Sequence, residues 1–205
     1  MNRFAPGLER VVNEIAACRI CRDSRVGRPL PHEPRPVLQP SSTARILIAS
    51  QAPGTRVHAS GKPFTDPSGE RLRKWLGIGP EIFYDPQRIA ILPMGLCFPG
   101  LSAKGSDLPP RPECAKAWRA RALAAMPQIE LVVAIGAYAL RWHMGDRYQA
   151  SLHDTVAAWR GGLSLSPPVI ALPHPSWRNN AWLKRNPWFE TDLLPVLRRE
   201  VAARL

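Results

Sequence analysis

Four short apolar runs recur along the chain, and a turn signal follows each of them. The runs are Ile46 to Ala49, Ile89 to Leu92, Leu131 to Ile135 and Val169 to Leu172. Runs of this length that are rich in Ile, Val and Leu are typical of strands buried on both faces. Strands that alternate with helical segments predict an α/β three-layer sandwich, in which helices flank a mainly parallel, four-stranded central sheet.

The helical segments are expected from apolar spacing and from capping signals. A helix before the sequence CRIC is indicated by the spacing of Leu8, Val11, Val12 and Ile15. We expect Ser68 to cap a helix that ends at Gly77. Further helices are expected over 113–126, 137–144 and part of 188–205. Pro195 delays or kinks the last of these, and the Pro- and Arg-rich residues 22–44 are expected to form a surface loop.

Length and composition describe one globular domain over residues 1–205. The chain is 45% hydrophobic and 21% charged, as in soluble proteins. Its longest strongly apolar stretch is far shorter than the roughly 20 residues that a membrane helix needs, and its start lacks the apolar region of a signal peptide. We therefore expect a cytoplasmic protein, a monomer without a membrane partner.

The charge balance favours a polyanionic partner. The chain has 28 Lys and Arg against 16 Asp and Glu, a formal net charge of +12 and a pI near 10.6, in the range of nucleic-acid-binding domains. A basic surface that is merely solvated is the alternative. Local basic groups lie at Arg19, Arg22, Arg25 and Arg28, at Arg71, Arg73 and Lys74, and at Arg178, Lys184 and Arg185.

Unusual loops follow the first and the fourth predicted strand. The first reads SQAPGTRVHASGKPF over residues 50–64, and the second reads PHPSWRN from Pro173. Ligands of open α/β sheets bind in the crevice at the carboxyl ends of the strands. We expect the two loops to form the walls of one pocket.

The two loops resemble motifs A and B of the uracil-DNA glycosylase superfamily. SQAPG, six further residues, GKPF and TDPSGERL follow the order and spacing of family 4, the iron-sulfur type. The HPS-x-RN wording of the second loop is similar to that of the single-strand-selective monofunctional glycosylases. The resemblance implies a glycosylase fold, DNA that contains a damaged or deaminated base as the partner, and base flipping into the pocket.

The cysteines provide a separate signal. Cys18 and Cys21 form a CxxC, and a cytosolic protein rarely uses such cysteines in disulfides. Cys97 and Cys114 complete a quartet of thiols, which suits a 4Fe-4S cluster or a structural zinc ion; buried free thiols are the alternative. In family 4 the cluster ligands lie at corresponding places, with the same separation of 17 residues (114 − 97). The resemblance thus implies a structural 4Fe-4S cluster.

The resemblance also implies roles for pocket residues. Phe64 stacks on the flipped base, and backbone groups around Gln51 meet one carbonyl edge of it. His174 and Gln51 form the expected catalytic set. Cleavage of an N-glycosidic bond leaves negative charge on the departing base, so a hydrogen-bond donor aimed at its carbonyl stabilises the transition state. A histidine that only satisfies local backbone groups is the alternative interpretation of His174.

The pocket departs from the family pattern at several positions. Ser50-Gln51 replaces the Gly-Glu of family 4. Ala52, an alanine in family 4 too, cannot orient water as the aspartate of family 1 does, so a slow enzyme is expected. Gly54 stands where family 1 has a tyrosine that excludes thymine, and is expected to leave the pocket floor open. Pro93 stands where family 4 has a uracil-reading asparagine, and proline offers no side-chain donor. The polar groups that replace it are expected among His58, Asp66 and Asn179.

The loop after His174 combines aromatic, basic and amide side chains. We expect it to wedge into DNA and to hold phosphates, through Ser176, Trp177, Arg178 and Asn179. No lysine in either motif favours Schiff-base lyase chemistry. The sequence therefore predicts a monofunctional DNA glycosylase of base excision repair.

Two alternatives remain open at this point. A protein of the same fold can recognise a modified base or single-stranded DNA without cutting it. An α/β hydrolase that uses Ser50 as its nucleophile is weakly supported, because the chain lacks the G-x-S-x-G elbow of that fold.

Overall fold

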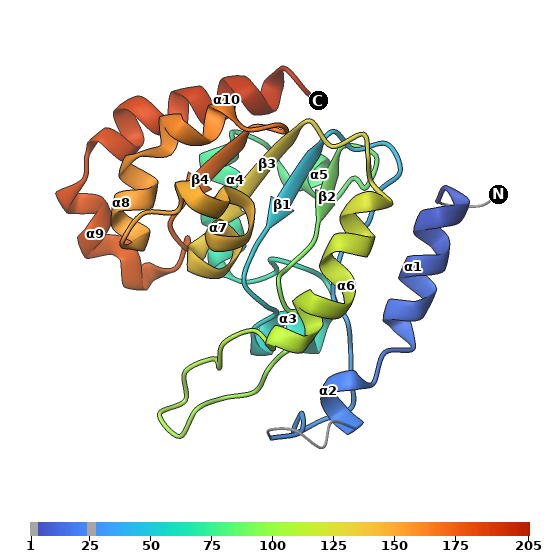
Figure 1. Ribbon diagram of the computed structural model, residues 1–205. Helices are drawn as coiled ribbons and strands as arrows, with labels where there is room; N and C mark the ends of the chain where they lie inside the picture. The colour runs from blue at the N-terminus through green and yellow to red at the C-terminus, as the bar shows by residue number, and fades with distance from the viewer. Residues whose placement is uncertain (1–3, 24–27) are drawn as a thin grey trace.

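The computed structural model describes residues 4–23 and 28–205 and confirms the predicted α/β sheet. Four parallel strands form the sheet in the order β2-β1-β3-β4. Helices surround it; Figure 1 shows α6 and α7 in front of the sheet and α4 and α5 behind it. The strands are β1 (Ile46–Ala49), β2 (Ile89–Ile91), β3 (Leu131–Ile135) and β4 (Val169–Leu172).

The strand side chains explain this arrangement. Every side chain of the four strands is buried, as parallel strands covered by helices on both faces require. Ile46 is in register with Ile89 of β2 and Leu131 of β3. The carboxyl ends of the strands therefore lie at one edge of the sheet, near α3 and the long loop before α6 (Figure 1).

The predicted helices are present with small changes at their ends. α7 begins at Gly136, one residue early, and Pro195 lies in the first turn of α10, so it delays that helix as expected. α10 packs against α4. The bounds are α1 Pro6–Ala16, α4 Pro67–Leu76, α6 Pro112–Ala124, α7 Gly136–Met144 and α10 Leu194–Ala202.

One capping prediction is wrong. Asp66 rather than Ser68 is the N-cap of α4, and its carboxylate accepts a hydrogen bond from the Gly69 backbone N–H at 3.2 Å. Pro67 occupies the first helical position, where its missing N–H costs nothing, so the helix begins before Ser68. Its other end agrees with the prediction, because Gly77 caps it in the left-handed conformation.

Several short elements were not expected from the sequence. The loop after β1 contains a helix, α3, and the segment between β3 and β4 contains, besides α7, the three short helices η1, α8 and η2. The C-terminal segment begins with a π-helical turn, η4. The added elements are α2 Ile20–Asp23, α3 Thr55–Ser60, α5 Pro80–Phe83, η1 Gly145–Arg147, α8 Leu152–Ala157, η2 Trp159–Ser164, η3 Trp177–Asn179, α9 Asn180–Arg185 and η4 Phe189–Leu193.

The N-terminal helix is held by apolar packing. Leu8, Val11 and Ile15 of α1 are buried in the main core, and α1 contacts α6. By contrast, α2, which carries Cys21, buries none of its residues. Within the described part of the chain, no helix has the length and apolar character needed to cross a bilayer.

Candidate functional site

Two adjoining cavities open at the carboxyl ends of β1 and β4. The outer cavity has a volume of about 680 Å³ and lies between the loops that follow these strands. The inner cavity, about 80 Å³, reaches Phe64 and Pro93. Both cavities are lined by Gln51, Ala52, Pro53, Gly54, Val57, Asp66, Ser68, Asp107 and His174.

Phe64 is held in an unusual backbone conformation at the inner cavity. Its φ angle is 56°, in the left-handed region that bulky residues rarely adopt. Its carbonyl accepts a hydrogen bond from the Tyr84 hydroxyl at 2.9 Å, and its ring packs edge-on against Phe83. The backbone of α4 approaches so closely that a Cβ at Gly69 would lie 1.9 Å from the Phe64 oxygen. The glycine is thus a steric requirement for the position of Phe64.

The backbone of motif A is fixed by the loop after β2. The Ser50 carbonyl accepts from the Met94 N–H at 2.8 Å, and the Gln51 carbonyl accepts from the Gly95 N–H at 2.9 Å. The Gln51 side chain lies beside the start of α7, because its Oε1 is 3.4 Å from where a Cβ on Gly136 would stand. Gln51 and Ala52 both face the two cavities.

His174 lies at the end of β4, on the boundary of the two cavities. It shares the inner cavity with Phe64, so the structure brings together the two side chains that the sequence assigned to base stacking and catalysis. Burial lowers the pKa of His174, although the carboxylates of Asp66 and Asp107 act to raise it. The imidazole is therefore neutral at pH 7 and retains one N–H to donate.

The loop after His174 is fixed by hydrogen bonds to its own backbone. The Asn179 side-chain amide donates to the His174 carbonyl at 2.6 Å, and the Arg71 guanidinium donates to the Ser176 carbonyl at 3.0 Å. The Asn179 amide thus shapes the loop. Trp177 is 72% exposed, and the Arg178 guanidinium lies 5.8 Å from its ring centroid. All four predicted DNA-binding residues line the outer cavity.

Two predicted base-binding residues differ in their placement. Pro93 lines the inner cavity, and its carbonyl accepts from the buried Arg119 guanidinium at 3.2 Å. His58 is not among the described residues that line either cavity. Its ring instead lies against His32, with centroids 4.2 Å apart, and against Phe98. The base-binding role of His58 has no support from this geometry.

Asp107 is a cavity residue that sequence reasoning missed. It comes from the long loop between β2 and α6, and it lines both cavities. Its Oδ2 would be 3.1 Å from a Cβ at Gly54. The space beside Gly54, which the sequence predicted to be open, therefore contains a carboxylate. Burial raises the pKa of Asp107, whereas Arg178 and His174 act to lower it.

The four cysteines line one small apolar cavity below α1 and α6. Cys18, Cys21, Cys97 and Cys114 are all free thiols. Burial raises the pKa of Cys21 and Cys97 to about 11. Two N–H groups donate to sulfur: Trp118 Nε1 to Cys18 at 3.2 Å, and the Leu96 backbone to Cys114 at 3.3 Å. Among residues 4–23 and 28–205, no group of three or more His, Cys, Asp or Glu side chains is arranged to hold a metal ion.

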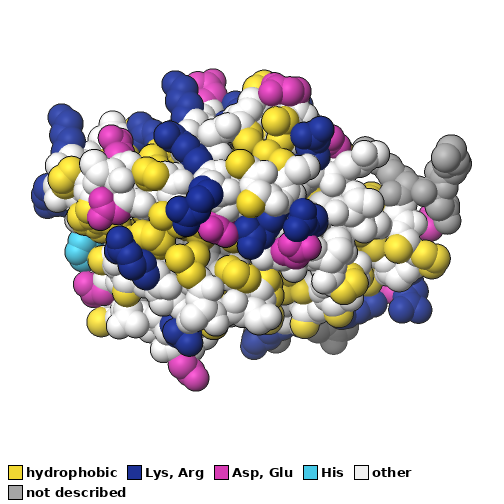
Figure 2. All heavy atoms as spheres, turned by 90° about the horizontal axis from the view of Figure 1, so that it is seen from above, with side chains coloured by type: hydrophobic (Ala, Val, Ile, Leu, Met, Phe, Trp, Pro, Cys, Tyr) yellow, Lys and Arg dark blue, Asp and Glu magenta, His cyan; other side chains and the backbone are white. Residues whose placement is uncertain are grey.

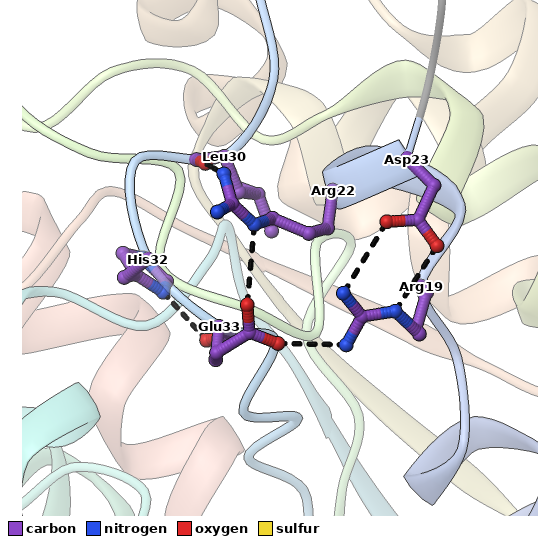
Figure 3. Close-up of polar contacts among 6 residues, drawn as sticks. All are labelled: Arg19, Arg22, Asp23, Leu30, His32 and Glu33. Carbon is purple, nitrogen blue, oxygen red and sulfur yellow. Dashed lines mark hydrogen bonds and ion pairs between the residues drawn. The ribbon is translucent and has the colours of Figure 1, made fainter.

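Ion pairs attach the CxxC segment to the following loop (Figure 3). Arg19 and Arg22 both pair with Glu33, at 2.7 and 3.3 Å, and Arg22 also donates to the Leu30 carbonyl at 3.0 Å. Arg19 and Arg22 are thus engaged in intramolecular ion pairs with Glu33. Arg25 lies outside the described residues.

Cationic side chains for a polyanion remain at the outer cavity. Arg56, Arg71 and Arg178 line it, and none of them forms an ion pair with a described acidic residue. On the face seen in Figure 2, by contrast, Lys and Arg side chains are interspersed with Asp and Glu. The three arginines thus concentrate positive charge at the outer cavity.

Comparison with known families agrees with this geometry. A sequence model described as the uracil DNA glycosylase superfamily matches residues 37–198, which is most of the 205-residue chain. The match includes both cavity loops, Phe64, Asp107 and His174, whereas Cys18 and Cys21 precede it. The chain therefore belongs to the uracil DNA glycosylase superfamily.

Proposed function

We propose that this protein is a monofunctional DNA glycosylase that flips uracil, or another deaminated or damaged base, out of DNA and hydrolyses its N-glycosidic bond. Membership of the superfamily supports DNA glycosylase activity in general. The observation that carries the proposal is the shared inner cavity of Phe64 and His174. An aromatic ring and a hydrogen-bond donor in one recess are the groups that bind a flipped base.

His174 acts in this proposal as a neutral hydrogen-bond donor. Its lowered pKa keeps the imidazole uncharged, and its N–H stabilises the negative charge that develops on a carbonyl of the departing base. Phe64 stacks on the base, and the motif A backbone around Gln51 contacts its edge. Pro93 offers no side-chain polar group to this edge, so we propose that the enzyme accepts more than one base.

The strand that carries the flipped base lies in the outer cavity. We propose that Trp177, whose side chain is largely exposed, fills the space that the extruded base leaves in the stack. Ser176 and the three cavity arginines bind phosphates, while Asn179 maintains the loop through its bond to the His174 carbonyl. The resemblance of this loop to single-strand-selective glycosylases favours unpaired DNA as a substrate.

Excision assays test the proposed activity. Excess protein is incubated with oligonucleotides that carry uracil, hypoxanthine, xanthine or hydroxymethyluracil, and abasic sites are then cleaved with alkali. We expect scission on at least one substrate and a loss of roughly 100-fold or more in the single-turnover rate of His174→Ala. His153→Ala, which removes an exposed histidine of α8, serves as the control. Tight binding with no scission would instead favour a non-cutting DNA-binding protein.

We further propose that the cysteine cavity holds a structural 4Fe-4S cluster. The donor set fits: four thiols line one cavity, and N–H groups donate to two of the sulfurs, as occurs around protein-bound clusters. Thiolates around a four-iron cluster lie further apart than around a single ion, which agrees with the lack of a compact ligand group among the described residues. When bound, the cluster links α2 to the loop before α6.

Metal analysis tests this assignment. Protein purified without oxygen is expected to be brown and to contain about four iron and four sulfide ions per chain. Cys114→Ala is expected to lose most of the iron. Zinc without iron would assign a structural zinc site, and the absence of both metals would leave four free thiols. None of these results changes the test of excision.

A further inference from the structure

Asp107 occupies the boundary between the inner and outer cavities. It lines both of them, as His174 does. In the proposed function the base enters the inner cavity while its strand stays in the outer one, so the glycosidic bond must cross this boundary. Among the residues that line both cavities, only Asp66 and Asp107 carry a carboxylate that can face the sugar and its C1′ atom.

The Asp107 carboxylate is available for a ligand. Asp66 is the other acid at the boundary, but its Oδ1 already accepts from the Gly69 N–H as the cap of α4. The Asp107 carboxylate, by contrast, accepts no hydrogen bond from another described residue. The residue is more than one third exposed, so water reaches it before DNA binds.

The backbone fixes Asp107 at this place. Asp107 forms an antiparallel bridge with Leu101, and the Leu108 N–H donates to the Gly100 carbonyl at 2.9 Å. On the opposite side, motif A makes room for the carboxylate because Gly54 has no side chain. The loop that carries Asp107 and the motif A loop at Gly54 thus fit together sterically.

We propose that Asp107 is a catalytic carboxylate of the glycosylase reaction, which holds and deprotonates the water that attacks C1′. The inference rests on the proposed function. The water oxygen forms a bond to C1′ while the bond from C1′ to the base nitrogen breaks. The electron pair of the broken bond leaves with the base. One water proton passes to Asp107, and the departing base later takes up a proton. Asp107 thus provides the carboxylate that motif A lacks, since neither Gln51 nor Ala52 carries one.

The reaction then depends on the charge of Asp107. The groups that face it are Asp66, His174 and Arg178. Because burial raises the pKa of Asp107, the rate should begin to fall at a higher pH than for a freely solvated aspartate as the solution is made acidic. An amide at this position has no such titration, so this acidic limb should disappear in Asp107→Asn.

Single-turnover excision by Asp107→Asn tests the proposal. We expect the rate to fall by roughly 100-fold or more, as for the loss of a general base, while the affinity for DNA is unchanged or higher. Asp146→Asn makes the same change of charge at an exposed position outside the two cavities and is the control. Added formate should partly restore the rate of Asp107→Ala, because it supplies a mobile carboxylate to the space that the side chain vacates.

The outcomes separate this inference from the function on which it rests. Wild-type protein without excision on any base would overturn both. Excision that requires His174 but proceeds equally in Asp107→Asn and Asp146→Asn would overturn the role of Asp107 alone. A slow Asp107→Ala that formate does not accelerate would reject proton transfer by this carboxylate.

Discussion

Phe64 adopts a strained backbone conformation because hydrogen bonds from neighbouring residues hold its carbonyl. A non-glycine residue in a sparsely populated backbone region costs about 1–3 kcal/mol and persists only where the surroundings over-determine it. Here Tyr84 and Arg73 both donate to the Phe64 carbonyl, at 2.9 and 3.4 Å. The ring is thereby held at the inner cavity before any base enters, so binding does not have to order it.

Gly69→Ala should disrupt this arrangement. The new methyl group would overlap the Phe64 carbonyl, and backbone atoms must move to relieve the contact. We expect a loss of stability of about 1–3 kcal/mol, together with slower excision because the ring is displaced. Denaturant unfolding and single-turnover assays measure the two effects.

Gly7→Ala on α1 is the matched control. Nothing lies within 4 Å of the position that its Cβ would take, and alanine favours a helix more than glycine does. This variant should unfold at the same or a higher denaturant concentration. Equal midpoints for Gly69→Ala and the wild type would contradict the steric argument.

Single residues were predictable where a motif contained them. Phe64 and His174 belong to spaced patterns, and the structure places both at one cavity. Asp107 stands alone in a Gly- and Pro-rich loop, and its approach to Gly54 depends on how that loop folds back. His58 lies within motif A, but the turn of α3 directs it toward His32 and Phe98. The positions of Asp107 and His58 along the sequence therefore did not reveal where their side chains lie.

At the level of elements, the sequence predicted those helices and strands that bury many of their residues. The four strands are apolar throughout, so their positions were clear from the pattern alone. The short helices α3 and α8 have only one or two buried residues each and are too brief to display a period. The start of α4 was predicted at Ser68 because the capping propensity of Ser was considered without the Asp66-Pro67 pair before it, in which Pro67 suits the first helical position. Capping propensity alone favours Asp66 and Ser68 about equally.

At the level of the whole molecule, charge is more localised than the composition suggests. The 28 Lys and Arg side chains include arginines that form ion pairs at the protein surface, such as Arg22 with Glu33 and Arg45 with Glu130. Binding of a polyanion should therefore depend on the cationic side chains at the outer cavity and not on the sum of all charges.

The salt dependence of DNA binding measures this contribution. For single strands, the slope of log affinity against log salt changes by about 0.7 for each neutralised phosphate. Arg56→Ala and Arg178→Ala should each make the slope shallower by about that amount. Arg10→Ala, at an exposed position of α1, should leave it unchanged. Equal slopes for all variants would place the DNA elsewhere.

Because Asp107 lies close to Gly54, these two positions, which are far apart in the sequence, are expected to change together during evolution. A bulky residue at 54, of the kind that would bar a methylated pyrimidine, collides with the carboxylate unless Asp107 is displaced or shortened. Stricter selectivity among bases in this fold therefore requires substitutions at positions 54 and 107 together. A lineage that acquires the first change alone would gain selectivity at the expense of turnover.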